Sequence, residues 1–162
     1  MLINHIKIFP YQIRFCNRYT NALFTIKERY GWIIELGSNG IIGYGDACPL
    51  EGFSDENYEQ ARYGLEGFKI SIENIKNIEI DELISLAAAH GAEQPSVHFA
   101  IESAIYDLES KIKKIPLNKY LNPTNALKSV NVSYYENFQE KEFDGMIVKL
   151  KIIDKNLFKS VE

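Results

Sequence analysis

The sequence predicts an α+β protein in which a three-stranded antiparallel sheet precedes several helices and a second domain begins near the carboxyl end. Three observations predict it. Asn39-Gly40 joins two apolar runs, which is the strongest short signal of a hairpin. An apolar stripe at helical spacing follows Pro95. Two short predicted strands, residues 129–134 and 146–152, follow a turn-rich hinge at residues 122–125. We therefore expect two domains, residues 1–122 and residues 123–162.

The composition is that of a folded globular protein. Of the 162 residues, 46% are hydrophobic and 25% are charged, with a net charge of −4. This mildly acidic charge does not indicate a basic surface for nucleic acid. No apolar run approaches the ~20 residues that a membrane span needs. Cys16 and Cys48 have neither metal nor redox spacing. We expect a cytoplasmic protein with free thiols and no nucleic-acid or membrane partner.

The predicted sheet comes from the first third of the chain. Residues 2–14 are rich in β-branched and aromatic side chains, which predicts a strand that is bent or interrupted at Pro10. Residues 15–27 are more polar, which is typical of an exposed loop. Residues 32–36 and 41–46 are expected to be the second and third strands, antiparallel across the hairpin turn.

Two helices are predicted in the middle of the chain. Ser54 is a good N-cap for the first helix, with Asp55 and Glu56 in the first turn, where the helix dipole favours acidic side chains. Asp81 is expected to cap a shorter second helix, which ends at Gly91.

The third predicted helix has the clearest pattern. Pro95 suits a first-turn position, because proline lacks the N–H that is unpaired there. The stripe that must face a core consists of Val97, Ile101, Ala104, Ile105, Leu108 and Ile112.

Segment 43–56, between a predicted strand and a predicted helix, is rich in glycine, proline, aromatic and acidic residues. Such a segment suggests a phosphate-binding loop at first sight. However, Pro49 intervenes, no lysine follows Gly52, and the incoming strand is antiparallel, so the segment does not match the phosphate fingerprints. We expect its glycines to serve close packing and tight turns.

Two lysines alternate with apolar residues in the last predicted strand, residues 146–152. Lys149 and Lys151 share one face, and the other face is wholly apolar. An ordinary half-buried strand would direct these lysines at water. In a barrel strand they would lie at the mouth, where such barrels keep their chemistry. Mutual repulsion and burial would then lower the pKa of one lysine and make it a general base.

These segments together resemble the enolase superfamily, in its muconate-lactonising-enzyme-like branch. Residues 43–49, Gly-x-Gly-Asp-x-x-Pro, resemble the end of the family's meander, although Asp46 replaces the usual glutamate. Residues 95–108 are similar to its last capping helix, and Val-Lys-Leu-Lys at 148–151 matches its Lys-x-Lys strand. The resemblance implies an enolase-type capping domain followed by the first strands of an incomplete (β/α) barrel.

Within that branch, residues 49–56 are most similar to the dehydratase of menaquinone biosynthesis, which is a carbon–oxygen lyase (hydro-lyase). N-succinylamino-acid racemases, dipeptide epimerases and cycloisomerases share the same skeleton and remain alternatives. Only eleven residues follow Lys151, whereas a barrel of this kind needs ~200 or more. We therefore expect an incomplete and inactive part of the enzyme. A non-catalytic binding or interaction module is the alternative from another class, and no oligomeric state is predicted.

The resemblance also implies roles for individual residues. Lys151 would abstract the proton α to the carboxylate of a small-molecule substrate, and Lys149 would tune its pKa. The family uses Mg²⁺, but its acidic ligands lie on later strands, so none is assigned here. Leu50, Gly52, Phe53 and Ser54 would lie in a lid over the barrel mouth, while Arg18 and Arg29 would meet substrate carboxylates. For Asp46, Glu56 and His98 we expect structural roles.

Overall fold

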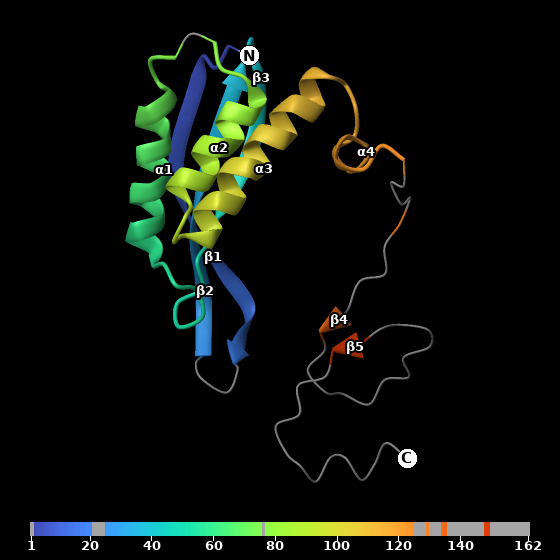
Figure 1. The fold of residues 1–162 in the computed structure, drawn as a ribbon. Coiled ribbons are helices and arrows are strands. Elements are labelled where there is room, and N and C mark those ends of the chain that lie inside the picture. Colours follow the sequence, from blue (N-terminus) through green and yellow to red (C-terminus); the bar gives the residue numbers. More distant parts are fainter. Residues whose placement is uncertain are drawn as a thin grey trace. The chain divides into compact units, whose positions relative to one another are not determined.

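The computed structural model describes residues 2–20, 25–75, 77–124 and 129, and the backbone of residues 134–135 and 148–149. The chain divides into two units, Met1–Ala126 and Leu127–Glu162, each of which is described by itself. This division falls a few residues after the boundary proposed at residue 122. Figure 1 shows the elements of each unit.

The first unit contains the expected three-stranded antiparallel sheet. Its strands are β1 (His5–Thr20), β2 (Thr25–Ser38) and β3 (Ile41–Ala47), in the order β1-β2-β3. The turn between β2 and β3 has φ values of 51° at Asn39 and 82° at Gly40. Two left-handed residues are what a two-residue hairpin turn of type I′ requires, so the predicted hairpin is confirmed.

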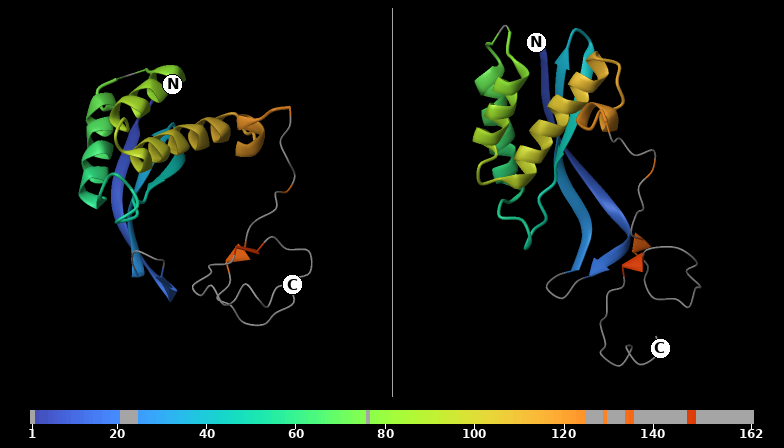
Figure 2. Two further views of the ribbon diagram at one scale, coloured as in Figure 1. Left: turned by 60° about the horizontal axis from the view of Figure 1, so that its bottom comes forward. Right: turned by 45° about the vertical axis from the view of Figure 1, so that its right-hand side comes forward.

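The ribbon formed by β1 and β2 is longer than the sequence predicts. The expected loop at residues 15–27 is wrong, because β1 continues to Thr20 and β2 already begins at Thr25, with a register shift between Arg14 and Tyr19. In Figure 2 this ribbon extends beyond the helices. The side chains described in this ribbon are exposed or half-buried, so the ribbon needs backbone pairing but no strict apolar alternation, and its polar side chains suggested a loop. Pro10 does not interrupt β1, because β1 is an edge strand.

In the described part of the chain, four helices follow the sheet: α1 (Tyr58–Ile72), α2 (Ile80–His90), α3 (Pro95–Ile112) and α4 (Leu117–Leu121). Helices α1, α2 and α3 cover one face of the sheet (Figure 1).

Two of the predicted helix starts are wrong. Helix α1 is capped by Asn57 rather than Ser54, since Asn57 Oδ1 accepts from the Gln60 N–H at 2.9 Å and the Asn57 N–H donates to Gln60 Oε1 at 2.8 Å. This reciprocal capping box satisfies two backbone donors, whereas a single hydroxyl satisfies one. Helix α2 begins one residue before Asp81, and its N-cap is Glu79.

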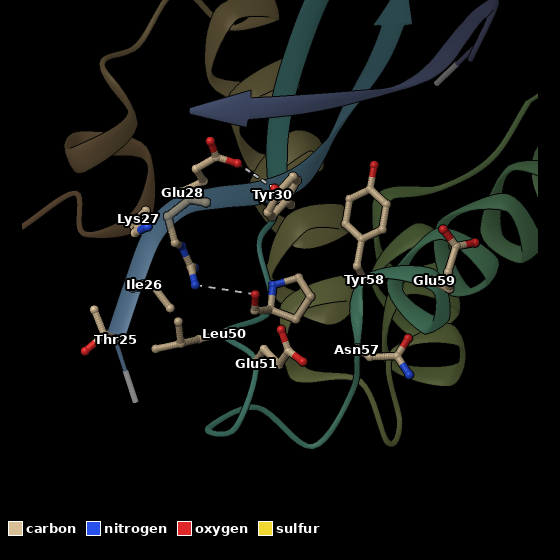
Figure 3. A pocket seen from close by; sticks show the side chains of 12 residues that line it. Thr25, Ile26, Lys27, Glu28, Tyr30, Leu50, Glu51, Asn57, Tyr58 and Glu59 are labelled. Atoms are coloured by element: carbon tan, nitrogen blue, oxygen red, sulfur yellow. Dashed lines mark hydrogen bonds between the residues drawn. The ribbon is translucent and has the colours of Figure 1, made fainter. Parts of the chain in front are cut away.

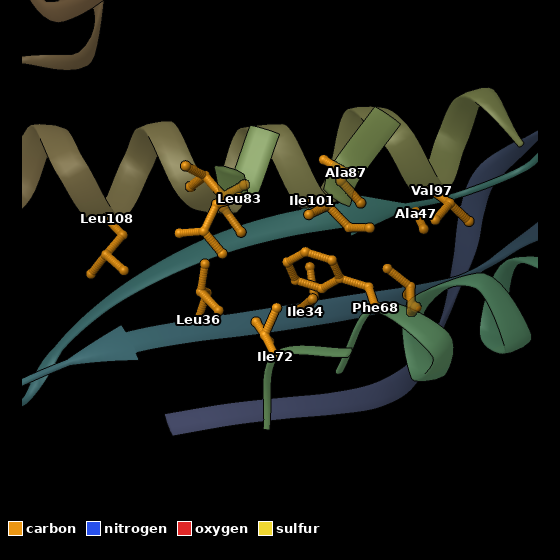
Figure 4. Packing of buried hydrophobic residues seen from close by; sticks show 14 of the residues in the cluster. Ile34, Leu36, Ala47, Phe68, Ile72, Leu83, Ala87, Val97, Ile101 and Leu108 are labelled. Carbon is orange, nitrogen blue, oxygen red and sulfur yellow. The ribbon is translucent and has the colours of Figure 1, made fainter. Parts of the chain in front are cut away.

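The hydrophobic core lies between the sheet and the helices (Figure 4). Five of the six residues predicted to form the stripe of α3 are fully buried, whereas Ile112, in the last turn, is 37% exposed. The stripe is therefore confirmed except at its end. The largest fully buried side chains that other elements contribute to the same cluster are Ile34, Leu36, Leu65, Phe68, Ile72 and Leu83.

Helix α3 lies directly on the backbone of β3. A Cβ atom added to Gly45 would lie 1.8 Å from the carbonyl oxygen of Ala100, and one added to Gly43 would lie 2.2 Å from that of Ala104. No side chain fits in either place. The two glycines therefore serve close packing, as the sequence predicts, and not the binding of phosphate.

In the second unit the described backbone forms a short parallel pair. Strand β4 (Tyr134–Tyr135) pairs with β5 (Val148–Lys149), with Tyr135 opposite Lys149. The barrel strands that the resemblance implies are not present in the described part of the chain, where each strand of this pair has only two residues. Lys151 lies outside the described residues.

Candidate functional site

The loop that joins β3 to α1, residues 48–57, carries four of the predicted substrate-contacting residues; we call it the capping loop. The N–H groups of Phe53 and Ser54 donate to the carbonyl oxygen of Leu50 at 2.9 and 2.8 Å. The N–H of Leu50 donates to Ser54 Oγ at 2.8 Å. Gly52 has a φ of 79°, a conformation that favours glycine. Residues 50–54 thus form a turn closed by its own hydrogen bonds.

Arg29, on β2, attaches the beginning of the capping loop to the sheet. Its guanidinium donates to the carbonyl oxygen of Cys48 at 2.6 Å and to that of Pro49 at 3.4 Å. The thiol of Cys48 donates to the carbonyl oxygen of Tyr30 at 3.3 Å. Charged donors form the stronger hydrogen bonds, so Arg29 is the main fastening at this end of the loop.

An aromatic group supports the junction between the loop and α1. The indole N–H of Trp32 donates to the carbonyl oxygen of Tyr58 at 3.0 Å, and the two rings stack with centroids 4.8 Å apart. Tyr30 meets Tyr58 edge to face at 6.2 Å. Burial raises the pKa of the Tyr58 phenol, and the neighbouring Glu59 raises it further. The indole hydrogen bond and the stacked rings together hold the start of α1 against β2.

Glu56 was expected in the first turn of the helix that follows the capping loop, but its side chain attaches the end of this loop to α3. It precedes the N-cap of α1, and its side chain is directed to α3, where Oε1 accepts from the Ser96 N–H at 2.7 Å. Only 3% of Glu56 is exposed. Helix α3 has no cap from Gln94, the residue at its own N-cap position, so Glu56 supplies a cap from 40 residues away.

A cavity of about 820 Å³ opens between β2 and the capping loop (Figure 3). It is lined by residues 25–30 of β2, 49–51 of the loop and 57–59 at the start of α1. The lining carries charges of both signs. On the β2 wall, the Tyr30 hydroxyl donates to Glu28 Oε2 at 2.6 Å, and this hydrogen bond is the main cause that lowers the pKa of Glu28.

The structure brings only some of the predicted site residues together. Leu50 and Arg29 line the cavity, whereas Phe53 is 79% exposed outside the lining and Arg18 is exposed on β1. Gly52 and Ser54 form the turn. The backbone of Lys149 lies in β5, and nothing is described of its side chain. The cavity-wall residues Glu28 and Tyr30 were missed, because the strand signal there is weak apart from the β-branched residues at 25–26.

The described residues do not fit a metal site of the kind that the resemblance implies. Within residues 2–20, 25–75 and 77–124, no group of three or more histidine, cysteine, aspartate and glutamate side chains is arranged to hold a metal ion. Mg²⁺ prefers several oxygen ligands, and the described part of the chain does not assemble them.

In the same ranges, none of the helices has the length and apolar character needed to cross a membrane.

Solved structures share the fold of this chain. A dipeptide epimerase from Methylococcus capsulatus, complexed with Mg and the dipeptide L-Arg-D-Lys, matches with a TM-score of 0.74 and 22% identity, over 86% of this chain and 39% of its own. A mandelate racemase/muconate lactonizing protein from Herpetosiphon aurantiacus matches with a TM-score of 0.70 and 15% identity, over 85% and 38%. The sheet and its helices therefore have the same fold as the matching part of these proteins, and it is the capping-domain fold that the sequence predicts.

Sequence comparison identifies the family within that class. The profile described as "MenC, N-terminal domain" matches residues 3–108, and the chain belongs to this family. An o-succinylbenzoate synthase from Vibrio cholerae serotype O1 (strain M66-2) is 27% identical over 91% of this chain. One from Aliivibrio salmonicida (strain LFI1238) is 29% identical over 67% of it. The chain spans 45% of the length of the first of these relatives and 31% of the second.

Proposed function

We propose that this chain is the capping-domain part of an o-succinylbenzoate synthase-type hydro-lyase. The observation that carries the proposal is the match to the MenC N-terminal domain, together with relatives named o-succinylbenzoate synthase that align over most of the chain. The proposed reaction is loss of water from the cyclohexadiene carboxylate precursor of menaquinone to give 2-succinylbenzoate. A cytoplasmic location accords with this reaction and with the free thiols of Cys16 and Cys48.

In the proposed mechanism Lys151 is the general base. Its neutral amine would take the proton α to the substrate carboxylate, and the electron pair of that C–H bond would form the new C=C bond as hydroxide leaves from the adjacent carbon. The ammonium so formed would return the proton to the leaving hydroxyl, so that water is the second product. Lys149, on the same face of the strand, would favour the neutral form of Lys151 by repulsion. We propose that any Mg²⁺ of the complete enzyme is held by residues outside the described part.

The capping loop and its cavity would supply the substrate-facing surface. Leu50 would present apolar surface to the ring of the substrate, with the exposed Phe53 beside it at the tip of the turn. Arg29 lines the cavity with its guanidinium already engaged by the loop backbone, so it would act on a substrate carboxylate mainly through charge. Arg18 is exposed and could meet a carboxylate only at the far end of the ribbon.

The test is a single substitution in the complete protein that carries this sequence. Lys151→Ala is expected to reduce formation of 2-succinylbenzoate by at least about 10³-fold while the far-UV spectrum and unfolding midpoint stay unchanged. Lys155→Ala, four residues later, is the matched control and is expected to retain activity. Retained turnover in the Lys151→Ala variant would show that Lys151 is not the general base.

The choice among superfamily reactions needs substrates rather than variants. The complete protein should be assayed with the menaquinone precursor, N-succinylamino acids and dipeptides side by side. We expect the precursor to give the highest kcat/KM. A higher value for an N-succinylamino acid would favour a racemase, and one for a dipeptide would favour an epimerase. Carboxylate binding without turnover of any of the three would favour a non-catalytic module.

A further inference from the structure

We propose that Glu56 is a positioning residue that latches the capping loop to the first turn of α3 and so sets the affinity for the substrate. The part of this inference that concerns substrate rests on the proposed function. The part that concerns the loop stands on the structure alone. Its basis is a buried carboxylate that joins two elements 40 residues apart in the sequence.

The burial of Glu56 needs an explanation beyond the start of its own helix. Helix α1 is already capped by Asn57 and Gln60 through reciprocal hydrogen bonds. Oε1 of Glu56 accepts from the Ser96 N–H, while Oε2 is buried without a hydrogen-bond partner in the described part of the chain. A carboxylate with one unsatisfied buried oxygen is costly, and the positive end of α3 offsets only part of that cost. The hydrogen bond that Glu56 does make joins the capping loop to α3, which points to a role in holding the loop.

The latch holds one end of the capping loop. At the other end, Arg29 holds the carbonyl oxygens of Cys48 and Pro49. Between the two attachments, residues 50–54 close on themselves through the bonds between Leu50 and Ser54. The position of Leu50 on the cavity wall is therefore set before any ligand arrives. A binding surface that is already ordered avoids the entropy cost of ordering it when the ligand binds.

Two reporters of the latch do not depend on catalysis. The backbone amides of Leu50, Phe53 and Ser54 all donate within the turn, so their hydrogen exchange reports opening of the loop. Trp32 is the only tryptophan of the chain, and it stacks on Tyr58, two residues after Glu56. Its fluorescence therefore reports the junction between the loop and α1.

The experiment compares Glu56→Ala with Glu56→Gln and with Asp55→Ala, in which an adjacent exposed carboxylate is removed. Glu56→Ala is expected to speed exchange of the Leu50, Phe53, Ser54 and Ser96 amides about tenfold or more and to change Trp32 emission. Glu56→Gln keeps an oxygen that can accept from Ser96 and should restore most of the protection. Asp55→Ala should match the parent.

Two results would overturn the latch. In the first, Glu56→Ala leaves the loop amides as protected as in the parent and exposes only the Ser96 amide, which would make Glu56 a helix cap alone. In the second, the loop amides of Glu56→Gln exchange hydrogen as fast as those of Glu56→Ala. If Glu56→Ala does not unfold cooperatively, Glu56→Asp replaces it, because the side chain keeps its charge but is one methylene shorter. Its loop amides are expected to exchange faster than those of the parent.

In the complete protein, loosening the latch is expected to raise KM about tenfold and to change kcat by less than about twofold, because the loop must then be ordered by the substrate. A fall in kcat with unchanged KM would overturn the link between the latch and substrate affinity. Absence of turnover in both parent and variant would count against the proposed function, and the exchange measurement would still decide whether Glu56 holds the loop.

Discussion

At the scale of single residues, Asp46 shows how a departure from the family pattern is accommodated. It stands where the resemblance leads one to expect glutamate, and both its carboxylate oxygens accept from the Tyr11 hydroxyl, at 2.9 and 3.0 Å. Burial raises the pKa of Tyr11, and hydrogen bonds to Cys48 and Asp46 raise it further. The pair holds β1 and β3 together across β2, and it supports the expectation that Asp46 has a structural role.

This pair gives the stability of the protein a defined dependence on alkaline pH. The pKa of Tyr11 is higher in the folded protein than its ordinary value of 10.0, so the folded state keeps the proton that the unfolded chain loses. The contribution of Tyr11 to stability is complete below about pH 10 and is lost as the pH rises toward the folded pKa. Tyr11→Phe should therefore show a shallower decline in the free energy of unfolding between pH 9 and pH 11, measured with urea.

The decline should not vanish, because the pKa values of Tyr30, Tyr58 and Tyr106 are also raised. Asp46→Asn keeps an acceptor for Tyr11 but removes the charge, and it should give an intermediate slope. Below pH 9, Tyr11→Phe is expected to lower the free energy of unfolding by about 1 kcal/mol through the lost hydrogen bond. A slope equal to that of the parent would contradict the role assigned to Tyr11.

At the scale of elements, the packing of α3 on β3 organises the first unit. The close approach depends on Gly43 and Gly45, and polar contacts border it: the Tyr44 N–H donates to Asp107 Oδ2 at 2.9 Å, and Lys111 Nζ lies 2.7 Å from the same oxygen. Both ends of α3 are thereby attached, since Glu56 holds its first turn. The position of the capping loop thus depends on the position of this helix.

Gly45→Ala is expected to lower the free energy of unfolding by about 3 kcal/mol or more, because its methyl group would overlap the Ala100 carbonyl oxygen and displace α3. Gly40→Ala is the control. Its Cβ would meet nothing within 4 Å, so only the φ of 82° opposes it, and a loss of about 1 kcal/mol is expected. Urea unfolding of both variants measures the difference. Equal losses in the free energy of unfolding would mean that α3 shifts to accommodate the added methyl group without an energetic penalty.

At the scale of the whole molecule, the core identified among the described residues runs from Ile3 to Leu108 and lies within the first unit. The first unit contains the sheet, the three longer helices and the residues that anchor the capping loop. A unit with its own core and its own hydrogen-bonded sheet can fold independently.

Residues 1–126, produced as a separate chain, are therefore expected to unfold in one cooperative transition. The free energy of unfolding should lie within about 0.5 kcal/mol of that of the 162-residue chain, and the m-value should be the same, because the surface exposed by unfolding the core is the same. Chemical denaturation followed by far-UV circular dichroism measures both. A gradual, non-cooperative transition would contradict the independence of the unit.

The sequence predicts the features that depend on neighbours within a few residues. The Asn39-Gly40 turn and the buried face of α3 follow from φ preferences and helical periodicity, and both are confirmed. The start of α1 was misplaced at Ser54, because Ser54 and Asn57 are both good N-caps. What separates them is that the Ser54 hydroxyl is already used by the Leu50 N–H within the closed turn.

The sequence by itself therefore determined the order of sheet and helices in the first unit, the close packing of its glycines and the family to which the chain belongs. The tertiary structure decided how the capping loop is held: Glu56 reaches α3, Arg29 reaches the loop backbone, and β2 forms a cavity wall. The physical reason is separation along the chain. Periodicity and caps are properties of adjacent residues, whereas the partner of a buried charge 40 residues away is known only once the elements have packed.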